Sequence, residues 1–132
     1  VTPVFKLSKD DIHNPAVVKT LLNKEKKAIY FSRAAIPFNR EKEKSLWNED
    51  CSYWGHIGVY GYRSDVLAMW KELPISILEK IESLEQLRLI EAGIKIHTIK
   101  AEKDSFSVDT VEQLKEARNI WNTIMSKQKK TI

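Results

Sequence analysis

The spacing of apolar residues along the chain predicts several strands. Val1–Phe5 has the composition of a strand, and Ile94–Ala101 alternates apolar and polar residues as a half-exposed strand does. Asn14–Asn23 and Lys27–Ala35 are rich in strand-forming residues and flank a short polar turn, which favours a hairpin. His56–Arg63, "HIGVYGYR", also alternates, and we expect a strand there although two glycines are unusual in one.

After His56–Arg63, the apolar residues have the spacing of helices. A short helix is predicted to begin at Ser64 as its N-cap and to stop before Pro74. A longer helix is predicted from an N-cap at Ser76 to a stop at Gly93. The expected buried stripe of this longer helix consists of Ile77, Ile81, Leu84 and Leu87.

A last helix is predicted to begin at "DTVEQL", capped by Asp109 or Thr110. Its expected apolar face consists of Val111, Leu114, Ala117, Trp121, Ile124 and Met125. Strands and helices in this order predict an α/β fold in one domain, residues 1–132. Because a strand begins at residue 1, we expect the intact protein to continue upstream.

One long segment shows neither the alternation of a strand nor the apolar spacing of a helix. Pro37 ends the hairpin, and residues 39–55, "NREKEKSLWNEDCSYWG", mix charged and aromatic residues irregularly. We expect this excursion to be the least ordered internal segment, and its composition permits closure over a substrate.

Composition narrows the class of protein. The 132 residues are 42% hydrophobic and 30% charged, as in a soluble globular chain, and no apolar run approaches a membrane span. We therefore expect no membrane association, and Cys51, the single cysteine, fits a reducing cytoplasm. The net charge of +4 is spread along the chain, so we expect no nucleic-acid partner, although it could help attract anionic small molecules.

Several polar residues are candidates for a binding site. Arg33 at the end of a strand and Arg40 after a proline-fixed loop suit a carboxylate or phosphate, or form ion pairs. His56 and Tyr60, four residues apart on a predicted strand, point to the same face, as in a pocket floor, although a structural histidine fits equally.

Two further candidates lie in helical segments. In the pair Glu85–Gln86, one side chain must lean toward the buried side, where sugar hydroxyls, Arg88 or a backbone carbonyl would satisfy it. Asp109 fits a helix N-cap, and a carboxylate there can also hold Mg²⁺. The chain has no glycine-rich phosphate loop, so a nucleotide would need its phosphate contacts from elsewhere.

Four blocks in order resemble the cytidylyltransferases that make CMP-Kdo, where Kdo is 3-deoxy-manno-octulosonate. The blocks are "YFSRAAIPFNR" (residues 30–40), "HIGVYGYR" (56–63), "LEKIESLEQLRLIEAGIKI" (78–96) and "VDTVEQL" (108–114). The element "IHNPAVVK" is also similar to one of that family. The resemblance implies an enzyme that joins CTP and Kdo to give CMP-Kdo and pyrophosphate for lipopolysaccharide synthesis.

The resemblance also implies a site and a fold. Arg33, Arg40, His56, Tyr60, Glu85 and Gln86 correspond to Kdo-binding positions, and Asp109 to a Mg²⁺-binding carboxylate. The implied fold is the C-terminal part of a nucleotide-diphospho-sugar transferase-like three-layer sandwich with a mixed sheet, in a homodimer. In this interpretation Gly58 and Gly61 clear space in the pocket floor.

Three departures limit what is implied. The family's opening nucleotide-binding segment and its first metal-binding aspartate have no counterpart, and Gln113 stands where an acid is usual. We therefore expect the sugar-binding and dimerising C-terminal half alone, without catalysis by this chain in isolation. The alternatives are a cytidylyltransferase for an 8-amino Kdo analogue, or a non-catalytic sugar-binding or dimerisation module.

Overall fold

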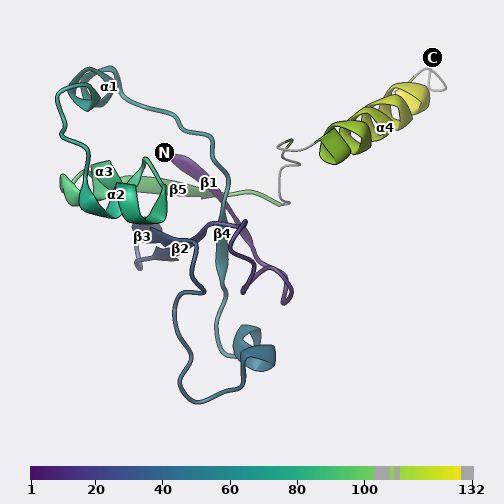
Figure 1. The fold of residues 1–132 in the computed structure, drawn as a ribbon, viewed down its shortest axis with the longest axis horizontal. Coiled ribbons are helices and arrows are strands. Elements are labelled where there is room, and N and C mark those ends of the chain that lie inside the picture. The colour runs from purple at the N-terminus through teal and green to yellow at the C-terminus, as the bar shows by residue number, and fades with distance from the viewer. Residues whose placement is uncertain (103–107, 109–110, 129–132) are drawn as a thin grey trace.

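The structure is a computed structural model that describes residues 1–102, 108 and 111–128. Its strands are β1 (Thr2–Lys6), β2 (Lys19–Leu22), β3 (Lys27–Ser32), β4 (Trp54–His56) and β5 (Ile96–Lys100). Its helices are α1 (Ser64–Trp70), α2 (Ile77–Glu82), α3 (Leu87–Glu91) and α4 (Val111–Gln128), with a 3₁₀ helix, η1, at Lys44–Glu49 (Figure 1).

The five strands form one mixed sheet in the order β1-β4-β2-β3-β5, which closes because β5 also pairs with β1. The β1–β5 pair is parallel and the other four pairs are antiparallel. A mixed sheet with helices confirms the coarse prediction. The predicted hairpin is also confirmed, because β2 and β3 pair with Lys19 opposite Ser32.

The predicted strand at His56–Arg63 is wrong beyond its first residue, since β4 ends at His56. The chain still follows β1, because the Ile57 N–H bonds to the Pro3 carbonyl at 3.1 Å. A second bond to β1 runs from the Gly61 N–H to the Val1 carbonyl at 2.9 Å, and between the two the Val59 N–H bonds back to the Ile57 carbonyl at 2.7 Å. This tight turn interrupts the ladder, and alternation of side chains alone does not reveal it.

The predicted long helix is also wrong as one element. It breaks at Ser83, which adopts the left-handed conformation with φ 53° and separates α2 from α3. Ser76 caps α2 as predicted, in a capping box with Glu79. Ser64 is instead the first residue of α1 and makes no cap bond with its side chain.

The break turns half of the expected stripe outward. Ile77 and Ile81 on α2 are 70% and 76% exposed, whereas Leu84 and Leu87 beyond the break are buried. A single straight helix would have placed all four on one side.

A bidentate ion pair fastens the two short helices to each other. Arg88 of α3 donates from Nε and Nη2 to the two carboxylate oxygens of Glu79 in α2, at 2.7 and 2.6 Å. The Arg88 guanidinium holds the pKa of Glu79 below its ordinary value through these bonds. Because the carboxylate is largely buried, the pair fixes the angle between α2 and α3.

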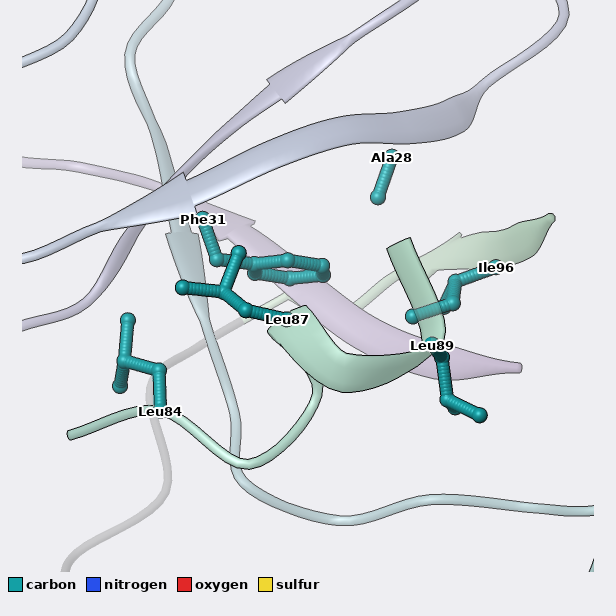
Figure 2. Close-up of a cluster of buried hydrophobic side chains, with 6 residues drawn as sticks. All are labelled: Ala28, Phe31, Leu84, Leu87, Leu89 and Ile96. Carbon is teal, nitrogen blue, oxygen red and sulfur yellow. The ribbon is translucent and has the colours of Figure 1, made fainter. Parts of the chain in front are cut away.

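The larger core lies where α3 covers the sheet. Phe31 of β3, fully buried, lies against Leu87 of α3, and Ile96 of β5 lies near Leu89 (Figure 2). The buried members of this cluster are Ala28, Phe31, Leu84, Leu87, Leu89 and Ile96.

A second core anchors the excursion of residues 39–55. Trp47 of η1 and Tyr53 are 2% and 1% exposed and pack with Phe5 of β1. The Trp47 indole donates to the Lys42 carbonyl at 3.0 Å, and the Tyr53 hydroxyl to the Pro37 carbonyl at 2.8 Å. The segment thus has buried anchors that its charged composition hides, and its low order stays a prediction.

The close approach of β1 to β4 requires a glycine at position 55. A Cβ on Gly55 would lie 2.5 Å from the Phe5 ring and 2.7 Å from the Leu7 side chain. Any larger residue would therefore push Phe5 out of the second core.

Helix α4 begins at Val111, in agreement with the sequence pattern, while its predicted caps, Asp109 and Thr110, lie outside the described residues. Of its predicted apolar face, Val111, Leu114, Trp121 and Met125 are exposed and Ala117 is half-buried. Val111 is 64% exposed and Trp121 is 62% exposed. In the described part of the chain, no helix is long and apolar enough to cross a membrane.

We predict that Leu87→Ala lowers the free energy of unfolding by about 2–5 kcal/mol, because it leaves a cavity beside Phe31. Ile81→Ala, on the exposed side of α2, should change it by less than about 0.5 kcal/mol. Urea unfolding of both variants measures the difference. Equal losses would indicate one continuous helix that buries both residues.

Candidate functional site

A cavity of about 690 Å³ opens at the end of β4, between the Ser83 break and the loop before β2. This volume lies within the range of small-molecule sites. Its polar and aromatic lining includes Asn14, His56, Tyr60, Tyr62, Trp70, Ser83, Glu85, Gln86 and Gln113.

Four of the predicted sugar-site residues meet in this cavity. His56 ends β4, Tyr60 follows the turn after it, and Glu85 and Gln86 lie between the Ser83 break and α3. Residues nearly thirty positions apart in the sequence are therefore brought together. Gly58 also lines the cavity, and a Cβ there would meet nothing within 4 Å, so this glycine does leave space.

Two buried polar atoms on the cavity-lining residues lack hydrogen-bond partners among the described residues. They are the Tyr60 hydroxyl and Nε2 of Gln86. Burial raises the pKa of Tyr60, so its hydroxyl stays protonated. A buried polar group without a partner is costly, and a ligand with hydroxyl groups would satisfy both.

His56 is held by three neighbours. Its Nε2 lies 3.0 Å from the Thr2 hydroxyl, and its ring packs against Phe31 at 4.9 Å and Tyr60 at 5.3 Å between ring centroids. Burial lowers the pKa of His56 to about 4, so the imidazole is neutral at physiological pH. His56 can therefore exchange hydrogen bonds with a ligand but does not supply a positive charge.

The aromatic contacts continue along the cavity lining. Tyr60 stacks on Tyr62 at 5.6 Å, Tyr62 meets Trp70 of α1 edge-on at 5.7 Å, and the Arg88 guanidinium lies 5.5 Å from the Trp70 ring centre. This row joins the cavity to the Glu79–Arg88 pair.

Residues 14–18 form another wall of the cavity. A buried lysine, which the sequence did not suggest, holds this wall in place. Lys19 is fully buried, and its Nζ donates to the carbonyls of Asn14 at 2.8 Å and Val17 at 2.7 Å. Burial lowers its pKa, and nearby Arg33 adds to the effect, while Glu82 opposes it. Lysine is rarely buried, so hydrophobic spacing gives no signal for such a role.

Arg33 lies beside this wall but does not line the cavity. Its Nη1 donates to the Pro15 carbonyl at 3.2 Å and its Nε to the Glu82 carbonyl at 3.1 Å. The Glu82 carboxylate in turn accepts from the Arg33 N–H at 2.9 Å and the Ser32 hydroxyl at 2.6 Å. Arg33 thus ties the wall to the end of α2, and its sugar-binding role stays a prediction.

Comparison with known proteins identifies the family. Residues 1–96 match the Cytidylyltransferase family. The chain belongs to this family.

Individual members of the family have sequences similar to this chain. It is 47% identical over 114 residues to a 3-deoxy-manno-octulosonate cytidylyltransferase of Thermodesulfovibrio yellowstonii, covering 86% of this chain and 45% of the relative. It is 44% identical over 123 residues to a protein of the same name from Chlorobaculum parvum, covering 91% and 48%. The chain thus spans about half the length of these relatives.

A solved structure agrees with this assignment. CMP:2-keto-3-deoxy-manno-octonic acid synthetase complexed with CTP superposes with a TM-score of 0.83 at 38% identity. The match covers 92% of this chain and 48% of that one.

The cavity lining does not include the other predicted residues that the structure describes. Arg40 is exposed in the excursion and does not line the cavity, and Asp109 lies outside the described residues. Gly61, expected to clear the pocket, instead lies against Val1, where a Cβ would approach to 3.1 Å. Among the residues that the structure describes, no group of three His, Cys, Asp or Glu side chains could hold a metal.

We predict that Tyr60→Phe does not lower the stability of the chain, since the Tyr60 hydroxyl has no partner among the described residues to lose. The matched control is Tyr53→Phe, which loses the bond to the Pro37 carbonyl and should cost about 0.5–1.5 kcal/mol. Urea unfolding measures both. A loss at Tyr60 as large as that at Tyr53 would show that its hydroxyl is already bonded.

The lowered pKa of His56 makes stability depend on pH. The folded protein protonates His56 near pH 4 and the unfolded chain near its ordinary 6.5, so the unfolded state binds more protons between these values. Stability from this group is therefore present above pH 6.5 and decreases by on the order of 3 kcal/mol as pH falls to 4.

Because carboxylates also titrate in this range, the measurement is the difference between wild type and His56→Gln in urea unfolding at several pH values. Glutamine keeps hydrogen-bonding capacity but does not titrate. The wild type should lose more stability than the variant between pH 6.5 and pH 4. Parallel curves would contradict the buried, neutral state of His56.

Proposed function

We propose that the cavity binds Kdo, as the sugar-acid site of an enzyme that transfers a cytidylyl group from CTP to Kdo. The observation that carries this proposal is that Tyr60 and Gln86, both with unpartnered buried polar atoms, line one cavity with neutral His56 in a chain of the cytidylyltransferase family. The names of the relatives and of the CTP complex support the same substrates.

The lining suits a polyhydroxylated sugar. The Tyr60 hydroxyl can donate or accept, the Gln86 amide donates, and the exposed Glu85 carboxylate accepts. A sugar hydroxyl can do both, so each group has a match. In the proposed reaction the anomeric hydroxyl of Kdo attacks the α-phosphate of CTP, and pyrophosphate leaves with the electrons of the broken P–O bond.

In this scheme the described residues bind and orient the sugar. Holding the attacking hydroxyl in position accounts for a large part of the barrier lowering in such displacements. We propose that Arg33 and Arg40 approach the sugar from the rim and that Asp109 holds Mg²⁺. The metal would supply charge neutralisation on the phosphates.

The proposal extends to the whole protein. We propose that the mixed sheet is the C-terminal part of a three-layer sandwich of the nucleotide-diphospho-sugar transferase type, in a cytoplasmic homodimer. The similarity to the CMP-Kdo synthetase structure over 48% of its chain supports the first part. Light scattering of the intact protein tests the dimer.

We predict that Kdo titrated into the protein gives a binding heat, and that Tyr60→Phe and Gln86→Leu each weaken Kdo binding up to about tenfold. Isothermal titration calorimetry measures both effects. Tyr53→Phe, which lies outside the cavity lining, is the control and should keep the wild-type affinity.

Absence of Kdo binding by the wild type, or equal weakening in the Tyr53 control, would contradict the assignment of the cavity. Cytidylyl transfer is measured separately, as pyrophosphate released when the intact protein receives CTP and Kdo. Release that requires both substrates is the expected result.

A further inference from the structure

The hydroxyl of Thr2 lies within hydrogen-bond distance of three groups but carries a single proton. Thr2 is fully buried in β1, and its Oγ1 lies 2.8 Å from the Val59 carbonyl, 3.2 Å from the Ile57 carbonyl and 3.0 Å from Nε2 of His56. A hydroxyl donates one hydrogen bond and can accept two. The group that receives the Thr2 proton therefore determines whether Nε2 of His56 donates to Thr2 or accepts from it.

The Thr2 hydroxyl donates its proton to the Val59 carbonyl. The Ile57 carbonyl already accepts the Val59 N–H at 2.7 Å. Among the hydrogen bonds of the described residues, the Val59 carbonyl accepts only from Thr2, at the shortest of the three distances. If Thr2 donated to His56 instead, two oxygens would face each other at 2.8 Å with no proton between them.

With its proton donated to Val59, the Thr2 hydroxyl accepts from His56. We propose that Thr2 is a positioning residue that fixes His56 as the Nε2–H tautomer and leaves Nδ1 as a hydrogen-bond acceptor for the ligand. The specificity that follows rests on the proposed function, because it names the ligand group at His56 as a sugar hydroxyl that donates. A carboxylate cannot donate and is disfavoured at this position.

The surroundings of His56 support a fixed ring. The β1–β4 register places Val4 opposite His56, so Thr2 lies two residues away along the neighbouring strand. Phe31 and Tyr60 pack against the imidazole. Burial also keeps the imidazole neutral, which leaves the lone pair on Nδ1 available at physiological pH.

The tautomer is observable by NMR without any ligand. The protein contains 3 histidines, so ¹⁵N-histidine labelling gives a simple long-range ¹H–¹⁵N spectrum. We expect His56 in the wild type as a single Nε2–H form with a proton protected from solvent exchange. Thr2→Ser should keep this pattern, whereas Thr2→Val should lose the protection and increase the Nδ1–H form.

An Nδ1–H form in the wild type, or an unchanged spectrum in a folded Thr2→Val, would overturn the proposal. Far-UV circular dichroism establishes that each variant is folded, and Thr2→Ser supplies a second test if Thr2→Val does not fold. Calorimetry should show Kdo binding about tenfold weaker in Thr2→Val and near wild type in Thr2→Ser.

The two proposals fail in different ways. Kdo should shift the His56 Nδ1 resonance of the wild type. If Kdo leaves that resonance unchanged while the tautomer depends on Thr2, the sugar site is contradicted and the positioning role is supported. If Kdo binds but the His56 tautomer is the same in wild type and in Thr2→Val, the positioning role is overturned.

Discussion

The bidentate contact between Glu79 and Arg88 determines how the cavity is built. It spans the left-handed turn at Ser83 and holds α2 and α3 at a fixed angle. Because α3 is only five residues long, its orientation depends on packing and on this pair more than on its own backbone hydrogen bonds. The turn places Leu84 and Leu87 in the core while Glu85 and Gln86 line the cavity. A continuous helix could not serve both surfaces with adjacent residues.

The sequence predicted the helices and strands better than the breaks between them. The hairpin, the strand before the last helix and the Ser76 cap follow from side-chain spacing and composition, which are local signals. The break at Ser83 could not be predicted because the apolar period continues across it. The Glu79–Arg88 contact spans the break, joins residues nine positions apart and depends on tertiary packing.

The grouping of four candidate residues in one cavity agrees with the family resemblance. His56, Tyr60, Glu85 and Gln86 lie in blocks that resemble a known family, and the structure brings them to one cavity. Their residue types alone left a structural role open for each. The supporting groups were not predictable, because they act through the main chain. Thr2 accepts from an imidazole while donating to a carbonyl, and neither partner leaves a pattern in the sequence.

The wall of residues 14–18 shows a further consequence of support through the main chain. Lys19 and Arg33 grip it by the carbonyl oxygens of Asn14, Pro15 and Val17, which every amino acid possesses. The main chain of this wall is therefore held in large part by side chains from outside it, while Oδ1 of Asn14 also accepts the Ala16 N–H at 2.9 Å and Val17 and Val18 pack against the two cores. Ala16, which is exposed and lines the cavity, could be exchanged during evolution and change the ligand surface, while Lys19 and Arg33 would be under strong constraint. Variation in ligand preference can thus arise here without rebuilding the fold.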